Sequence, residues 1–159
     1  MSVVARVGEY LDAQHIQYDV IHHGLSNSSI DSARAAKISP MKLAKAVILE
    51  DHEGRYMMAV LPSMNKIRLH KLADTFQRDF HLISERRVYK MFDDCEPGAV
   101  PPIGRAYNME AVYDELLEEQ KDVFLEAGDH QSLIHLKQSE FKKLVADCQH
   151  GRFSGEVFH

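Results

Sequence analysis

The chain has 159 residues, of which 45% are hydrophobic and 27% charged, and its formal net charge is −5. This length and composition are typical of one globular domain with a core of its own. No apolar run approaches the roughly 20 residues needed to span a bilayer, which excludes a helical membrane protein. The N-terminal residues mix charges into an amphipathic pattern without a signal-peptide profile, so a cytoplasmic protein is expected.

The first third of the chain predicts alternating helices and strands. Val3, Val4, Val7, Tyr10 and Leu11 recur at helical spacing. The segment 17–21 alternates and carries β-forming residues, and His22-His23-Gly24 ends it. Ser28 and Asp31 have the spacing of a capping box. The expected elements are a helix over 2–14, a strand over 17–21, a helix from Ser28 to about Lys37, and a short helical turn over 41–44.

The middle and end of the chain predict hairpins and further helices. The run 45–50 is apolar, 51–54 reads as a turn and 55–61 as a returning strand, so a β-hairpin is expected over 45–62. The remaining expected elements are helices over 67–76, 85–92 and 140–148, strands over 106–107, 111–113, 122–127 and 132–136, and a loose polar tail from Gln149. The sequence therefore predicts a single α+β domain with a mixed or antiparallel sheet surrounded by helices.

Three of the five prolines and two of the eight glycines lie in one stretch, Asp94–Gly104. Proline fixes φ and lacks an amide donor, whereas glycine adopts backbone conformations closed to other residues. A segment that alternates the two is a stiff loop of defined shape. Such a loop serves either as a rigid connector or as a backbone wall that a ligand can approach closely.

Basic residues are concentrated in the middle of the chain and acidic residues in its later half. The segment 34–45 carries Arg34, Lys37, Lys42 and Lys45 and no acidic residue, whereas 66–90 carries seven basic and three acidic residues. A basic surface for a phosphate backbone and an ordinary surface of mixed charge both fit this distribution. Lys45 stands at the entry of an apolar strand, where a lysine is either solvated or holds a phosphate or carbonyl at a cavity rim.

The common signatures of metal and nucleotide chemistry are absent from the sequence. There is no HExxH or Cys/His cluster, and the ten histidines show no known ligand spacing, so no metal is expected. GxSxG, the phosphate-binding GxxxxGK[ST] pattern and GxGxxG are also missing. Cys95 and Cys148 have no CxxC spacing and suggest no disulfide framework. Cys95 lies in the rigid loop, where a structural role is expected.

Three segments together resemble the YbaK / prolyl-tRNA synthetase-associated domain family of aminoacyl-tRNA deacylases. They are Leu43–Leu49 (LAKAVIL), Gly98–Gly104 (GAVPPIG) and Glu126–His130 (EAGDH). The resemblance covers about 20–146, and one such domain is expected to occupy 1–159. It implies a compact, curved mixed sheet with helices packed around it, and hydrolysis in trans of the ester that joins a wrong amino acid to the 3′ end of a tRNA.

The resemblance also implies which residues act. Lys45 matches a lysine at the start of a strand, and Gly98 through Pro102 match a GxxxP loop. Lys45 and Gly98 are the expected catalytic residues, and the substrate-binding residues are expected to be Ser29, Ile30, Met58, Ala99, Val100, Pro101, Pro102, Gly128 and His130. No metal or organic cofactor is implied. The expected partners are the acceptor end of a mischarged tRNA and an aminoacyl-tRNA synthetase that delivers it.

Two other functions fit the sequence as well. A non-catalytic module could hold an aminoacyl or nucleotide-like ligand, because no side-chain nucleophile is evident. A regulatory interaction domain could use the acidic stretch from Glu110 to Asp122 as a docking surface, although a solvated helix end explains these charges equally simply.

Overall fold

The strand β2 (Leu43–Asp51) lies at the centre of the sheet in a computed structural model that describes residues 3–24 and 28–156. Its apolar run pairs in an antiparallel register with β3 (Tyr56–Pro62), so that Lys45 faces Leu61 and Ile48 faces Met58. The turn between them contains Gly54 at φ +81°. The hairpin predicted over 45–62 is thus confirmed, and it begins two residues earlier than expected.

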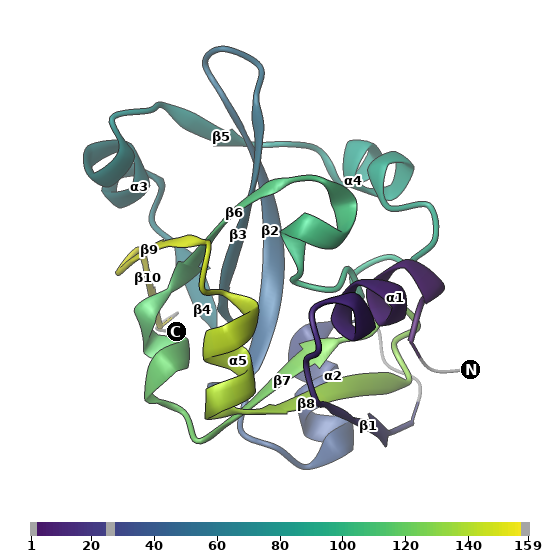
Figure 1. Ribbon diagram of the computed structural model, residues 1–159. Helices are drawn as coiled ribbons and strands as arrows, with labels where there is room; N and C mark the ends of the chain where they lie inside the picture. The colour runs from purple at the N-terminus through teal and green to yellow at the C-terminus, as the bar shows by residue number, and fades with distance from the viewer. Residues whose placement is uncertain (1–2, 25–27, 157–159) are drawn as a thin grey trace.

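The other elements surround this hairpin in the order shown in Figure 1. The helices are α1 (Ala5–Ala13), α2 (Ser29–Ala36), α3 (Leu69–Phe76), α4 (Glu85–Met91) and α5 (Gln138–Leu144), with 3-10 turns η1 (Gly104–Tyr107) and η2 (Glu115–Glu119). The remaining strands are β1 (Asp19–His22), β4 (Asn65–Ile67), β5 (Phe80–Leu82), β6 (Glu110–Asp114), β7 (Asp122–Glu126), β8 (Ser132–Lys137), β9 (Gln149–Gly151) and β10 (Ser154–Glu156).

The main sheet is mixed, as expected. Its strand order is β1-β8-β7-β2-β3-β6-β9, and β5 pairs with the far end of β2. The pairs β2–β7, β3–β6 and β6–β9 are parallel, and the other pairs of this sheet are antiparallel. The strands β4 and β10 form a separate two-stranded sheet. The result is a single α+β domain.

Helices cover both faces of the sheet. Val7 and Leu11 of α1 and Phe141 of α5 pack with Leu125 and Ile134 on one face, where α1 and α5 lie in front of β7 and β8 (Figure 1). On the opposite face, Ala33 of α2 packs against a small cluster formed by Leu43, Phe124 and Leu133. Alternation along β7 sends successive side chains to opposite faces, which explains how one short strand serves both clusters.

The helix α2 begins as its capping box predicts. The Ser28 Oγ accepts a hydrogen bond from the Asp31 amide at 3.2 Å, which satisfies one of the free amides of the first turn. The helix ends at Lys37, which adopts a left-handed conformation at φ +60°. Ser2, the first residue of the helix predicted over 2–14, lies outside the described residues, and α1 begins at Ala5.

Three predictions about local structure are wrong. The residues 106–107, expected as a strand, lie in the 3-10 turn η1, and the helical turn expected over 41–44 gives way to strand from Leu43. The tail from Gln149 is not loose, because β9 pairs with β6 and β10 pairs with β4. Phe153, between these two strands, is buried. The Asp114 carboxylate accepts hydrogen bonds from the Phe153 amide and from the Ser154 hydroxyl. The residues 157–159 of that tail lie outside the described part.

The acidic side chains of the stretch from Glu110 to Asp122 form contacts within the molecule. Each of its six carboxylates contacts a group of this chain: Arg78 (Glu110), Ser154 (Asp114), His150 (Glu115), Tyr113 (Glu118), Arg152 (Glu119) and His135 (Asp122). A docking surface needs charges that are available to a partner. Engagement of all six therefore favours a structural role over the docking role.

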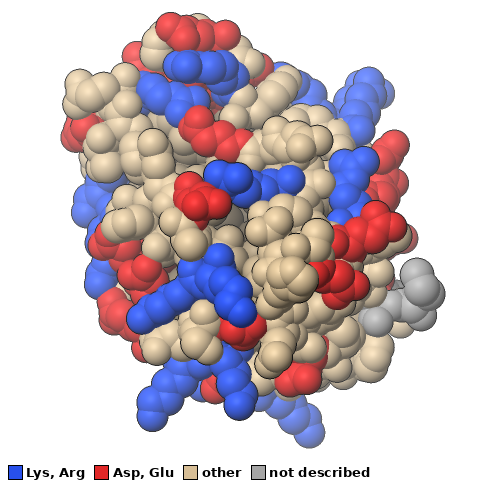
Figure 2. Space-filling model, in the orientation of Figure 1, with Lys and Arg blue, Asp and Glu red and all other residues tan. Residues whose placement is uncertain are grey.

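The two signs of charge are interspersed on the face shown in Figure 2. The basic and acidic segments of the sequence thus do not appear there as two separate fields. Among the described residues, the structure has no helix long and apolar enough to cross a membrane.

Candidate functional site

The sheet has a gap along one edge of β2. On that side, β7 pairs with Leu43 and Ala44, β5 pairs with 49–51, and the Ile83 amide after β5 donates to the Ile48 carbonyl at 3.5 Å, so the described strands leave 45–47 unpaired there. A cavity of about 620 Å³ opens at this gap. It is lined by Ser28, Ser29, Ile30, Lys45, Ala46, Val47, Ile48, Ser63, Leu82, Ile83, Glu85, Val88, Tyr89, Pro97, Gly98 and Val100.

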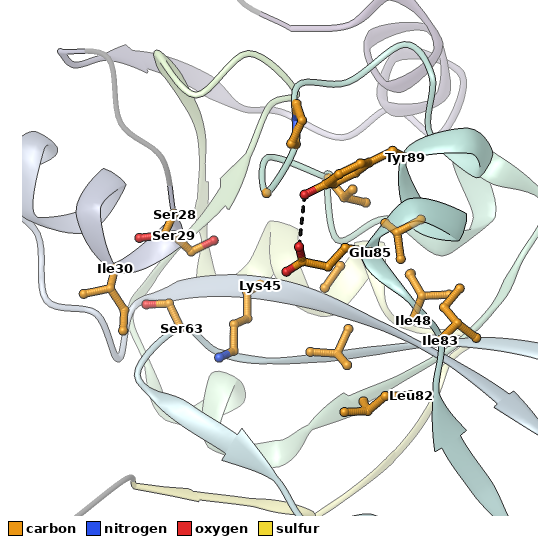
Figure 3. A pocket seen from close by; sticks show the side chains of 16 residues that line it. Ser28, Ser29, Ile30, Lys45, Ile48, Ser63, Leu82, Ile83, Glu85 and Tyr89 are labelled. Carbon is orange, nitrogen blue, oxygen red and sulfur yellow. Dashed lines mark hydrogen bonds between the residues drawn. The ribbon is translucent and has the colours of Figure 1, made fainter. Parts of the chain in front are cut away.

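Lys45 lies at the middle of the cavity. In Figure 3 the serines Ser28, Ser29 and Ser63 lie on one side of it, and Leu82, Ile83 and Tyr89 lie on the other. Its side chain is half-buried, and no carboxylate in 3–24 or 28–156 forms an ion pair with it. Burial lowers the pKa of the Lys45 ammonium below its ordinary value, because desolvation disfavours the charged form. Such a cation is poised to interact with a negative group on a ligand.

The Pro/Gly loop forms a second wall of the cavity. Gly98 adopts φ +81°, which favours glycine, and it is exposed together with Pro97. The amides of Gly98 and Val100 have no hydrogen-bond acceptor within the described chain, whereas the intervening Ala99 amide donates to the Glu96 carbonyl at 3.0 Å. Two free amides on a stiff loop are available to an oxyanion.

A buried histidine supports this loop from behind. The His130 Nε2 lies 2.5 Å from the Pro97 carbonyl, and its Nδ1 lies 3.5 Å from the Glu126 carboxylate. The Glu96 amide donates to the Gly128 carbonyl at 2.7 Å, which joins the same turn to the loop a second time. The turn itself needs Gly128, at φ +109°, since a Cβ there would lie 2.5 Å from the Val4 Cγ1. The segments 94–104 and 126–130 therefore meet in space.

Glu126 connects His130, which contacts the Pro/Gly loop, to the helix α2. Its buried carboxylate accepts hydrogen bonds from the Ser32 hydroxyl at 3.0 Å and from the Ser29 hydroxyl at 3.3 Å, in addition to its contact with His130. Sequence reasoning missed this residue as an anchor. The available signal was one carboxylate at an inward position of the apolar strand 122–127, because a buried charge requires partners.

The pKa of His130 is expected to be raised in solution, mainly by its contact with the Glu126 carboxylate. A raised folded-state pKa contributes stability that is fully present below the unfolded pKa of about 6.5 and is lost as pH rises through the folded value. NMR titration of the His130 ring should therefore give a pKa above 6.5, and the free energy of unfolding should fall across that window.

Glu126→Gln is the matched variant, because it removes the charge and keeps the side-chain shape. It should lower the pKa of His130 and flatten the pH dependence of unfolding in the same window. An unchanged titration of His130 in this variant would contradict the assigned ion pair.

The predicted site residues divide between the cavity and its surroundings. Five of them line it: Lys45, Gly98, Val100, Ser29 and Ile30. Ala99, Pro101 and His130 are buried behind the wall, Gly128 shapes the supporting turn, and Pro102 lines a small separate void near Tyr10. Met58 is fully buried in the core, on the face of the hairpin opposite to Lys45. The lining residues Ser63, Leu82, Ile83, Glu85, Val88 and Tyr89 were not predicted.

The cavity supplies hydroxyls, amides, one ammonium and the Glu85 carboxylate, but no activated side-chain nucleophile. Burial raises the pKa of the Cys95 thiol to about 12, and the thiol contacts Tyr107 and Asp94 outside the cavity. A thiol with this pKa is not an effective nucleophile at neutral pH. Within the described residues, no three His, Cys, Asp or Glu side chains are grouped to hold a metal ion. The arrangement suits a reaction in which water attacks a polarised carbonyl.

The model of a known protein family matches most of the chain. The residues 23–144 match the model of the aminoacyl-tRNA editing domain. That range includes all the residues that line the cavity. No protein of curated function matches the sequence significantly.

Solved structures share the fold at low sequence identity. The hypothetical protein APE2540 superposes with a TM-score of 0.83 at 18% identity, covering 94% of this chain and 99% of the other. A "putative trans-editing enzyme for prolyl tRNA synthetase" superposes with a TM-score of 0.79 at 18% identity, covering 96% of each chain. A "putative signal transduction protein" from Marinobacter aquaeolei gives 0.75 at 19% identity, covering 95% of this chain and 30% of the other. The fold thus also occurs within a longer chain.

Proposed function

Because this chain belongs to the aminoacyl-tRNA editing domain family, we propose that it is an aminoacyl-tRNA deacylase. It hydrolyses, in trans, the ester that joins a wrong amino acid to the 3′ end of a tRNA. The observation that carries the proposal is one cavity lined by the Lys45 ammonium and by Gly98 and Val100. Among the described residues, that ammonium has no ion-pair partner and the amides of Gly98 and Val100 have no acceptor. We assign 1–159 to one such domain, because Val7, Leu11 and Phe153 complete the core outside 20–146.

The reaction needs a placed water and a stabilised oxyanion. Water attacks the ester carbonyl carbon, the bond to the ribose oxygen breaks, and the water proton passes to that oxygen, leaving a free amino acid and a free tRNA end. The neighbouring ribose hydroxyl of the substrate helps to activate the water. The amides of Gly98 and Val100 stabilise the charge on the carbonyl oxygen, and Lys45 orients the ester or the terminal phosphate.

The fixed loop makes this stabilisation effective. Preorganised donors lower a barrier because they do not need to reorient as charge develops. Here the loop is held by the His130 contact with Pro97 and by the Glu96 amide on Gly128. No metal or organic cofactor takes part in the proposed reaction.

The amino acid is selected by the fit of its side chain in the cavity. Ser29, Ile30 and Val100 line the same cavity as the proposed oxyanion donors and can contact that side chain. Selection by size alone is weak, at about 1–3 kcal/mol per methylene group. We therefore expect partial rather than absolute discrimination among small amino acids, and delivery of the tRNA by a synthetase in the cytoplasm would add to it.

Deacylation of purified alanyl-, cysteinyl-, seryl- and prolyl-tRNA tests the proposed function directly. At least one of the four is expected to be hydrolysed faster than its spontaneous rate, with multiple turnovers. Binding of these tRNAs without accelerated hydrolysis would contradict the enzyme and favour a non-catalytic binding module. The same tRNAs without the amino acid are the control for binding that does not depend on the aminoacyl ester.

A further inference from the structure

The large hydrophobic side chains that are exposed in the described residues lie around one cavity. They are Ile30 at 41%, Leu82 at 54% and Tyr89 at 43% relative exposure, and all three line the cavity at the β2 gap. Single exposed hydrophobic residues are ordinary, but their gathering at one rim marks a surface that a ligand covers. Leu82 and Tyr89 lie on the side of Lys45 away from the serines (Figure 3).

The helix α4 places one acidic and two basic side chains near this aromatic ring. The Tyr89 hydroxyl donates a hydrogen bond to the Glu85 carboxylate at 3.3 Å (Figure 3), and the two cations are Arg86 and Lys90. Arg86 lies three residues before Tyr89 and four residues before Lys90, so it neighbours both side chains on the helix surface, and Lys90 lies on the other side of Arg86 from Tyr89. Both cations are exposed, and neither forms an ion pair with the described residues. Arg87 on the adjoining face differs, since the Glu50 carboxylate accepts from it. An exposed aromatic ring flanked by free cations is typical of surfaces that bind single-stranded nucleic acid.

The size of the cavity leaves room for more than an amino acid. Its volume of about 620 Å³ is in the range of sites for drug-sized ligands, which span roughly 300–1,000 Å³. The polar half, with Lys45, Gly98 and Ser29, suits the ester and the aminoacyl group. The other half, with Leu82, Val88 and Tyr89 and with the Glu85 carboxylate on the Tyr89 hydroxyl, is then open to a flat group next to the ester.

We infer that the α4 side of the cavity binds the unpaired 3′ end of the substrate RNA, with the terminal base stacked on Tyr89 against Leu82. Arg86 and Lys90 contact the phosphates of that single strand. The inference rests on the proposed function, because it names the part of the substrate that lies beside the ester. It gives α4 the role of a substrate-binding platform that is separate from the groups that stabilise the oxyanion.

Binding of a non-hydrolysable probe tests the platform without relying on catalysis. The probe is a short single-stranded RNA ending in C-C-A whose terminal ribose carries alanine through an amide, and alanine amide without nucleotides is the base-free comparison. Tyr89→Ala should weaken the Kd for the RNA probe about 5- to 150-fold, the range for loss of one stacked base. Tyr89→Phe should change it less than about twofold, because the ring is retained. Leu82→Asn should weaken binding in the same direction.

Salt dependence tests the two cations. Removing two phosphate contacts in Arg86→Gln/Lys90→Gln should make the slope of log K against log salt shallower by about 1.4. Lys121→Gln/Lys142→Gln removes the same charge from exposed positions outside the cavity and should leave the slope unchanged. An unchanged slope in the α4 variant would contradict the phosphate contacts.

The outcomes separate the platform from the enzyme. If Tyr89→Ala binds the RNA probe as tightly as the wild type, the inference is overturned. Equal weakening for alanine amide would also overturn it, because Tyr89 would then contact the aminoacyl group. If the wild type binds the probe through Tyr89 but hydrolyses no aminoacyl-tRNA, the platform stands and the proposed deacylase fails.

Discussion

Lys45→Ala is expected to lower kcat/KM for the aminoacyl-tRNA that the wild type hydrolyses by about 100- to 1,000-fold, the usual loss for one preorganised electrostatic group. The loss should come without destabilisation, because Lys45 is half-buried and has no described carboxylate partner. Removal of a desolvated, unpaired charge is expected to leave the melting temperature unchanged or slightly raised. Single-turnover deacylation and thermal unfolding of the same preparation measure both effects.

Two further substitutions isolate the charge. Lys45→Met keeps the apolar stem and should lose nearly as much activity as Lys45→Ala, whereas Lys45→Arg keeps the charge with a different geometry and should retain part of it. Lys42→Ala removes a lysine from the turn just before β2, outside the cavity, and should retain activity within a few-fold. A Lys45→Met protein that deacylates at the wild-type rate would remove the ammonium from the mechanism.

The hairpin and the position of Lys45 within it could be predicted because the sequence signals for both are local. The apolar run from Val47 to Leu49, the turn at Gly54 and the returning strand specify β2 and β3 by period and turn chemistry. The Ser28 capping box likewise specifies the start of α2. Such features depend on residues a few positions apart, and a sequence displays them directly.

The gap that makes the cavity depends on distant pairing and could not be predicted. The strand β5 has only three residues, Phe80–Leu82, and it exists because it pairs with the end of β2, about thirty positions earlier. That pairing brings Leu82 and the following helix α4 to the cavity. The placement of Met58 has the same origin, because the face on which a strand residue lies depends on register.

The buried contacts behind the loop are also hidden in the sequence. The three resembling segments indicate that 98–104 and 126–130 belong together, but not that His130 contacts Pro97 from the far side of the wall. The same holds for the C-terminal strands, since Asp114 holds Phe153 and Ser154 from about forty positions away. His130, which the sequence marks as a candidate for chemistry, thus holds the wall of the cavity and does not line the cavity itself.

Gly98→Ala is expected to lower kcat/KM about 10- to 100-fold, because a small displacement of the free amides misaligns them with the oxyanion. The residue adopts φ +81°, where a side chain costs about 1–2 kcal/mol, and the loop would relax by turning its peptide planes. Gly54→Ala is a matched control, since Gly54 has the same φ of +81° at the hairpin turn and open space around its Cβ position.

The comparison of these two variants separates strain from catalysis. Both should lose similar amounts of stability in chemical denaturation, because the same backbone conformation is strained in each. Only Gly98→Ala should lose deacylation, since Gly54 lies outside the cavity. Equal activity in the two variants, at equal stability, would mean that the loop is a rigid connector and that the oxyanion is stabilised elsewhere. A selective loss in Gly98→Ala would instead locate the stabilising donors on the Pro/Gly loop.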